Sequence, residues 1–296
     1  DMEREADRVG YGVMTDAGYE PQGFVTMFEK LQQAARLSDN GAYPYLRSHP
    51  MTTERIADAQ ARQQLMPKRP PVATTPLHAM MAARAQVLTH PGPDMLRSIV
   101  SVANSNLAAQ PKSKQAGLLY GAALASLKQR DWPAAKRYGA QLQNLAGLDA
   151  PAQRVVRLLS AEVSLTSSDA AQALSTLEAK AWPRTDRAAR LQMAQTRLAQ
   201  QKAAQAKQVT DDLVLWVSQN PRDASAWTLL SQAYDQLGDA LRSIRAQAES
   251  RAVELDYAAA IDRFKAAQNV AVRLDREGKL DRAGHIEASV IDARLR

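Results

Sequence analysis

A spaced pattern of small residues in the second half of the chain constrains the fold more than any other feature. Ala123, Ala161, Ala194 and Ser231 follow one another at intervals of 38, 33 and 37 residues. Each of the three alanines is followed by a second alanine twelve positions later, at Ala135, Ala173 and Ala206. Small side chains at such positions let two helices touch closely, while larger ones fill the space between hairpins. The pattern predicts a row of stacked helical hairpins.

Two sequence segments near the C-terminal end support this prediction. The segment from Trp227 to Asp239 has most of the marker residues of a repeat's first helix, and the segment from Asp256 to Ala267 has the pattern of a second helix. With a period of about 34 residues, this half of the chain resembles tetratricopeptide repeats. The helix around residues 240–255 can close one unit and open the next, so the number of repeats stays open. An unrelated helical bundle is the alternative.

Composition favours the same all-α class. Only 5% of the 296 residues are aromatic and only 13 are glycine, and long stretches rich in alanine and glutamine lack β-branched runs. No apolar run approaches the roughly 20 residues of a membrane-spanning helix, so no transmembrane segment is predicted. The absence of cysteine excludes disulfides, thiolate catalysis and zinc bound by cysteine. The chain opens on polar, helical residues without a signal-peptide pattern, and we expect a truncated or processed chain.

Three helices are predicted in residues 1–66. The first runs from Met2 to Ala17, where Gly18 stops it, and the second begins at Pro21. The third is capped by Thr52 and continues to about Gln64.

A stiff linker is predicted next, because four prolines fall within residues 67–76, at Pro67, Pro70, Pro71 and Pro76. Residues 1–66 carry a net charge of −3, from 7 basic and 10 acidic residues, which leaves +10 for the remaining 230 residues of the total of +7. The repeats in residues 77–296 are therefore expected to favour an acidic partner on the concave surface lined by their first helices. Scattered, solvated charges are the alternative. No basic run exceeds Lys68-Arg69 and the aromatics are not interleaved with basic residues, so nucleic acid is not a predicted partner.

Few residues of the first segment could carry chemistry. Glu3 and Asp7 are four residues apart and therefore share one face of the first helix, where acidic residues also offset the helix dipole. His49 lies in a predicted loop between Ser48 and Pro50. The other three histidines show no metal-ligand spacing.

These pieces together resemble a known group of enzymes. The motif Glu3-x-x-Ala6-Asp7 is similar to the Glu-x-x-Ala-Asp helix of the HtpX/CAAX-prenyl-protease superfamily of zinc metallopeptidases. Ser48-His49-Pro50, followed by Glu54-Arg55-Ile56, resembles a second motif of that superfamily in the same order. The resemblance implies the C-terminal helices of a gluzincin-type peptidase domain, followed by a superhelix of tetratricopeptide repeats.

The resemblance also implies roles for individual residues. Glu3 would be the third ligand of a catalytic zinc ion, and Asp7 would orient a ligating histidine. His49 and Arg55 would flank the site and stabilise the oxyanion; His49 could instead occupy the open zinc position in a resting state. The other two ligands and the general base come from a His-Glu-x-x-His helix in this superfamily.

That His-Glu-x-x-His motif does not occur in these 296 residues. We therefore expect the chain by itself to be inactive and its full-length parent to be a zinc metalloendopeptidase. The resemblance further implies a periplasmic location, with unfolded or stalled outer-membrane β-barrel proteins and the β-barrel assembly machinery as partners. A non-enzymatic repeat scaffold that binds other proteins is the alternative.

Overall fold

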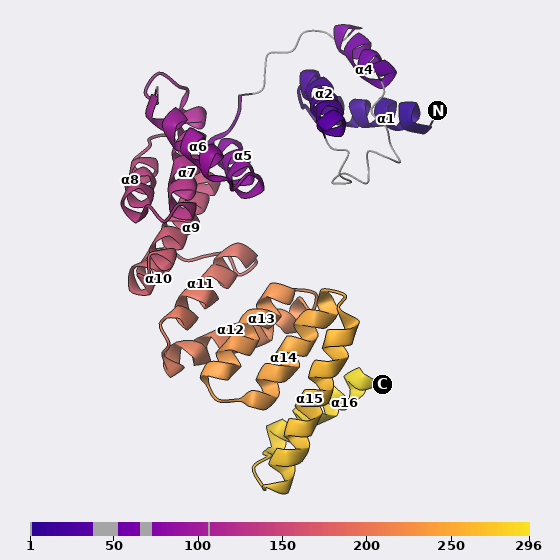
Figure 1. Cartoon of the computed structure of the whole chain (residues 1–296), viewed down its shortest axis with the longest axis vertical. Coiled ribbons are helices and arrows are strands. Elements are labelled where there is room, and N and C mark those ends of the chain that lie inside the picture. The colour runs from indigo at the N-terminus through magenta and orange to yellow at the C-terminus, as the bar shows by residue number, and fades with distance from the viewer. Residues whose placement is uncertain (1, 38–52, 66–72, 106) are drawn as a thin grey trace. The chain divides into compact units, whose positions relative to one another are not determined.

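The computed structural model describes residues 2–37, 53–65, 73–105 and 107–296 of the chain (Figure 1). These described residues form fifteen α-helices and no strand, which confirms the predicted all-α class. None of the described helices is both long and apolar enough to cross a bilayer. The chain divides into two compact units, residues 1–74 and 75–296.

The first unit contains the helices α1 (Met2–Asp16), α2 (Pro21–Leu37) and α4 (Thr53–Leu65). Each of the three packs against the other two. Helix α1 ends ahead of Gly18, whose φ of +84° is a backbone conformation that glycine adopts without strain. A small apolar core of four buried residues joins α2 to α4: Val25, Phe28, Ile56 and Ala59.

The second unit is a row of twelve helices in the described residues. They are α5 (Pro76–Thr89), α6 (Pro93–Ser105), α7 (Lys112–Lys128), α8 (Trp132–Gln143), α9 (Ala150–Thr166), α10 (Ala170–Glu178), α11 (Arg187–Ala199), α12 (Ala203–Gln219), α13 (Ala224–Gln236), α14 (Ala240–Val253), α15 (Tyr257–Arg276) and α16 (Arg282–Leu295). From α6 to α16 each helix packs against the next, and α7, α9, α11 and α13 also contact one another in turn. Helix α14, whose place in the repeat pattern the sequence left open, contacts α13, α15 and α16.

Aspartates define where most of these helices begin. In eight helices the residue before the first turn is an Asp whose carboxylate accepts a hydrogen bond from the backbone N–H three residues later; these are Asp131, Asp149, Asp169, Asp186, Asp223, Asp239, Asp256 and Asp281. The first N–H groups of a helix have no partner within the helix, so such a cap typically contributes about 1 kcal/mol.

At four of these aspartates, a tight turn connects the capped helix to the helix before it. The residue just before the Asp has a positive φ at Arg130, Ser168, Gly238 and Leu255. The N–H of the Asp then bonds to the carbonyl five residues earlier, at 2.9 Å from Asp131, Asp169 and Asp239 and at 3.0 Å from Asp256. This bond closes the end of one helix while the carboxylate opens the next, which explains how such short connections reverse the chain.

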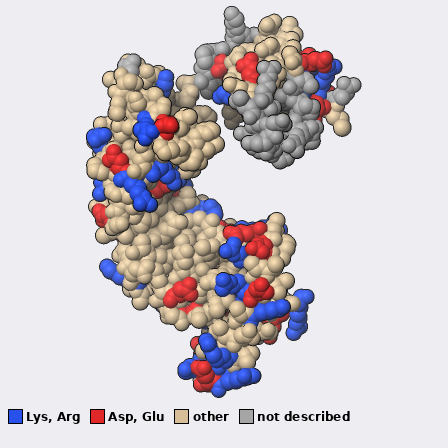
Figure 2. Space-filling view, viewed as in Figure 1, with Lys and Arg blue, Asp and Glu red and all other residues tan. Residues whose placement is uncertain are grey.

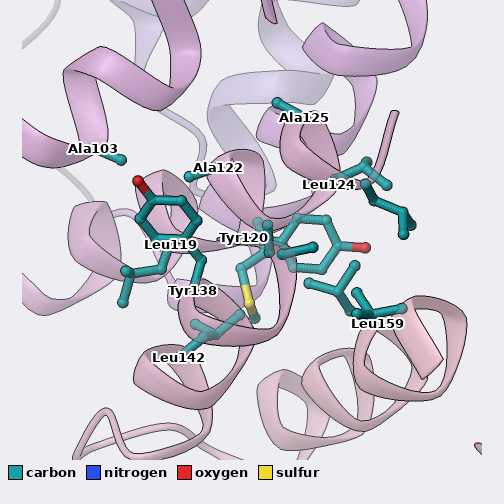
Figure 3. Close-up of a cluster of buried hydrophobic side chains, with 14 of the residues drawn as sticks. Ala103, Leu119, Tyr120, Ala122, Leu124, Ala125, Tyr138, Leu142 and Leu159 are labelled. Atoms are coloured by element: carbon teal, nitrogen blue, oxygen red, sulfur yellow. The ribbon is translucent and has the colours of Figure 1, made fainter. Parts of the chain in front are cut away.

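The largest core cluster of the second unit lies around α7 (Figure 3). Tyr120 is fully buried there, and its hydroxyl accepts a hydrogen bond of 3.0 Å from Arg84, which also forms an ion pair of 2.9 Å with Glu162. Burial raises the pKa of Tyr120. Tyr138 donates a hydrogen bond of 2.8 Å to Asn104. The polar ends of both tyrosines are thus satisfied inside an apolar cluster.

Arginine–aspartate pairs connect α9, α11 and α13 at their N-terminal ends. Arg154 binds Asp186 through two bonds of 2.5 Å, and Arg187 binds Asp223 through two bonds of 2.8 Å. The hydrogen bonds from Arg154 lower the pKa of Asp186. Burial would raise the pKa of Asp223, but the hydrogen bonds from Arg187, Trp216 and a backbone N–H outweigh it, and the pKa falls. The aspartate that caps α11 therefore also attaches this helix to α9, and the aspartate that caps α13 attaches that helix to α11.

Two glycines provide a test of how closely these helices pack. A Cβ atom at Gly117 of α7 would lie 2.9 Å from the backbone oxygen of Ala79 in α5, whereas a Cβ at Gly139 of α8 would meet nothing within 4 Å. We expect Gly117→Ala to lower the free energy of unfolding by about 1–3 kcal/mol. Gly139→Ala should raise it by roughly 0.5–1 kcal/mol, because alanine favours a helix interior.

Urea denaturation followed by tryptophan fluorescence measures both changes, since all four tryptophans lie in the second unit. A Gly117→Ala protein as stable as the unsubstituted chain would show that α5 and α7 are not in close contact.

Candidate functional site

The helix α1 brings two predicted site residues onto one face. Glu3 and Asp7 are separated by one helical turn, and Tyr11, one turn further, is buried in the same helix. Glu3 lies in the first turn, where its negative charge also opposes the helix dipole. The apolar side of α1 is therefore fixed against the unit while its acidic end faces α4.

Arg55 of α4 joins these two carboxylates. Its Nε and one terminal nitrogen donate to the two oxygens of Asp7 at 2.7 and 2.6 Å, and its other terminal nitrogen lies 3.0 Å from an oxygen of Glu3. The Arg55 side chain is only 7% exposed, compared with 15% for Asp7 and 34% for Glu3. A buried guanidinium requires such charged partners, and the two-pronged contact also fixes the orientation of Asp7.

Aromatic side chains support this cluster from α1 and α2. The guanidinium of Arg55 lies 5.3 Å from the centre of the Phe28 ring. Phe24 contacts Phe28 with ring centres 4.5 Å apart and meets Tyr11 edge-on at 5.5 Å. These aromatic rings form an apolar surface beside Arg55, so water screens the charged contacts of Arg55 less than it would at an open surface.

A second group of charges lies at the rim. Arg4 forms an ion pair of 2.7 Å with Glu54 and lies 3.8 Å from Asp58, and all three side chains are at least half exposed. Exposed pairs of this kind contribute little to stability. The Arg55 cluster, and not this rim, is the candidate functional site.

The site as described does not fit a zinc ion by itself. No group of three or more His, Cys, Asp or Glu side chains that could hold a metal occurs among the described residues. A catalytic zinc ion takes three protein ligands, and within the described part of the chain Arg55 brings together two carboxylates, Glu3 and Asp7. A zinc site would need further ligands from residues outside the described part of the chain.

The predicted site residues thus fall into two groups. Glu3, Asp7 and Arg55 are brought together by α1 and α4, whereas His49 lies outside the described residues. Sequence reasoning missed that Arg55 binds both carboxylates. The signal was present in α4, because Arg55 is adjacent to buried Ile56 and four residues before buried Ala59, on the side of the helix that packs inward.

Comparison with known proteins shows what these residues are similar to. Residues 1–63, which include Glu3, Asp7 and Arg55, match the profile of peptidase family M48. The chain is 28% identical over 254 residues to the Beta-barrel assembly-enhancing protease of Escherichia coli K12, an alignment that covers 85% of this chain. The proteins of that name from Shigella flexneri and Escherichia coli O157:H7 give the same values. The metallopeptidase resemblance predicted from the motifs is confirmed.

The similarity has a defined extent. The alignment covers 49% of each relative, so the chain spans about half the length of the curated relatives it matches. Within this chain it extends far beyond the 63 residues of the peptidase profile and therefore includes much of the helical row as well.

Proposed function

We propose that this chain is the C-terminal part of a periplasmic zinc metalloendopeptidase that acts in the assembly and quality control of outer-membrane proteins. One observation carries the proposal: the residues that match the peptidase profile include the three side chains that α1 and α4 bring together. Residues 1–66 would belong to the peptidase domain, residues 67–76 to a linker and residues 77–296 to tetratricopeptide repeats.

Each residue of the cluster has a task in this proposal. Glu3 would supply one carboxylate ligand for zinc, which when bound would activate water for peptide hydrolysis, and the remaining ligands would come from elsewhere in the full-length protein. Asp7 holds a ligating histidine in position, and Arg55 fixes Asp7 through its two-pronged contact. We also assign Arg55 a role toward the oxyanion, from the motif resemblance. We assign His49 to the same site from the motif resemblance.

The proposed partners follow from the relatives. Their name refers to β-barrel assembly, and we extend this to unfolded or stalled outer-membrane β-barrel proteins and the β-barrel assembly machinery. The row of helices in the second unit provides the surface for binding them. Stacked helical hairpins commonly present such extended surfaces to other proteins.

A non-enzymatic scaffold is the second candidate. The observation that favours it is the incomplete donor set, since the described residues hold no group of three metal-binding side chains. If the protein is such a scaffold, the role of the Arg55 cluster is to stabilise the first unit.

Casein hydrolysis by the full-length protein separates the two candidates. We expect hydrolysis that a zinc chelator abolishes and added zinc restores, because the water nucleophile depends on the metal. The 296-residue chain should show none under either condition. Hydrolysis that persists in chelator would contradict the zinc mechanism, and a full-length protein without any hydrolysis would favour the scaffold.

A further inference from the structure

A large cavity of the second unit lies where α14 meets its neighbours. It has a volume of about 950 Å³ and is lined by residues of α12, α13, α14, α15 and α16 and of the turns after α12 and α14. We call it the α14 groove. Its volume is at the upper end of the range for ligand sites and far exceeds what a single small anion fills.

Charged side chains form part of the groove lining. Arg242, Arg245 and Arg294 line the groove together with two carboxylates, Glu249 and Glu287. Glu287 lies 3.0 Å from Arg245 and 3.7 Å from Arg242, and Glu249 lies 2.8 Å from Arg294 and 3.6 Å from Arg245. Asp239, the residue before α14, also lies 2.6 Å from Arg242. Three guanidinium groups thus share three carboxylates, and their charges balance. Each guanidinium has five N–H donors, so N–H donors remain in excess. In Figure 2, Lys and Arg appear beside Asp and Glu on this C-terminal part of the unit.

A fourth cation lies at the end of the groove near the α12–α13 turn. Arg222 is exposed and forms no ion pair or side-chain hydrogen bond with another described residue. It therefore adds a positive charge that no carboxylate of the described residues pairs with, and the four arginines together with Asp239, Glu249 and Glu287 have a net charge of +1. An acidic group on a ligand would complement this charge.

Apolar side chains also line the groove: Val214 and Val217 of α12, Trp227 and Leu230 of α13, and Val290 of α16. The Arg245 guanidinium lies 5.4 Å from the centre of the Trp227 ring, so charged and apolar side chains adjoin in the lining. Val214 is 46% exposed. A free anion would leave this surface uncovered, whereas a peptide segment with apolar side chains would cover it.

We propose that the α14 groove binds an extended peptide segment of a partner protein, in which an acidic side chain lies next to large apolar side chains. The carboxylate contacts Arg222 and the arginines of α14, and the apolar side chains lie against Val214 and its neighbours. The proposal rests on the proposed function, in which the second unit binds proteins, and it names the chemistry of the bound segment and its location.

Fluorescence anisotropy on the 296-residue chain tests this proposal. The probe is a short fluorescent peptide with one aspartate between two leucines, compared with one that has asparagine in that place and one that has serines in place of the leucines. We expect each change to weaken binding by about tenfold, and the affinity for the aspartate peptide to fall as salt is added.

Two matched pairs of variants locate the site. Arg222→Glu should weaken binding of the aspartate peptide by on the order of a hundredfold, because it reverses a charge at the groove. Arg263→Glu makes the same change at an exposed position of α15 outside the groove and should leave binding unchanged. Val214→Glu should also weaken binding, whereas Leu215→Glu, at an exposed neighbour outside the groove, should not.

Equal effects within either pair, or equal binding of the aspartate and asparagine peptides, would overturn the proposal. Melting curves of the variants confirm that each still folds, as expected for changes at exposed positions. If the 296-residue chain does not bind the aspartate peptide but the full-length protein shows chelator-sensitive casein hydrolysis, the groove proposal is contradicted and the peptidase proposal is not. If the chain binds the peptide but the full-length protein does not hydrolyse casein, the peptidase proposal is contradicted and the groove proposal is not.

Discussion

Full-length protein carrying Glu3→Gln is expected to lose casein hydrolysis by well over a hundredfold. Replacing a residue that only orients a zinc ligand costs roughly 10- to 100-fold, and a ligand contributes more. Glutamine has almost the same shape as glutamate but lacks the negative charge that binds the metal. Because Glu3 is 34% exposed, its loss should change the melting temperature little.

Glu5→Gln is the matched control for this prediction. Glu5 lies in the same first turn of α1, is exposed and pairs only with Arg8 in the contacts of the described residues. Its replacement should leave hydrolysis within about twofold, since exposed pairs of this kind contribute little. Similar losses in both variants would indicate that the first turn of α1 matters for folding and not for zinc.

Arg55→Met is expected to destabilise the first unit by about 3 kcal/mol. The methionine retains much of the apolar stem beside Phe28 but leaves Asp7 and Glu3 without their shared cation. Removing one partner of a largely buried ion pair has such an effect because the remaining charge stays partly shielded from water. Arg8→Met, at an exposed pair on α1, should change stability by less than about 1 kcal/mol.

Hydrogen exchange of α1 and α4 in the 296-residue chain measures this effect. Tryptophan fluorescence should not change, because every tryptophan lies in the second unit. Protection of α1 and α4 equal to that of the unsubstituted chain would show that the Arg55 cluster does not hold the two helices together.

The helices of the first unit were largely predictable from local sequence signals. The predicted helix from Met2 to Ala17 extends from Met2 to Asp16, and the second begins at Pro21 as predicted. The third was expected to end near Gln64 and ends at Leu65. Glycine with a positive φ and proline at a first helical position act within a few residues, and this is why the sequence contains enough information to place these ends.

The contacts of Arg55 were not predictable in the same way. Arg55 and Asp7 are 48 residues apart, and their meeting depends on how α1 packs against α4. The sequence identified Glu3, Asp7 and Arg55 through motif resemblance, which names residues but not their partners. The interpretation paired Arg55 with His49, which lies outside the described residues, so this pairing stays a prediction. The contacts of Arg55 with both carboxylates were not anticipated.

The α14 groove was equally hidden in the sequence. The excess of basic residues after position 66 indicated a positively charged surface but not its location. That location depends on α14, which packs against α13 and also against α15 and α16. A helix that can belong to either of two neighbouring repeat units has a sequence pattern that fits both, so its packing had to be seen in three dimensions.

Zinc content after dialysis tests the central claim most directly, since it asks whether Glu3 is a ligand in a site that this chain only partly supplies. The account predicts about one zinc ion per molecule of the full-length protein and far less for its Glu3→Gln variant. It predicts no retained zinc for the 296-residue chain. Stoichiometric zinc in the isolated chain, or in the full-length Glu3→Gln protein, would contradict it.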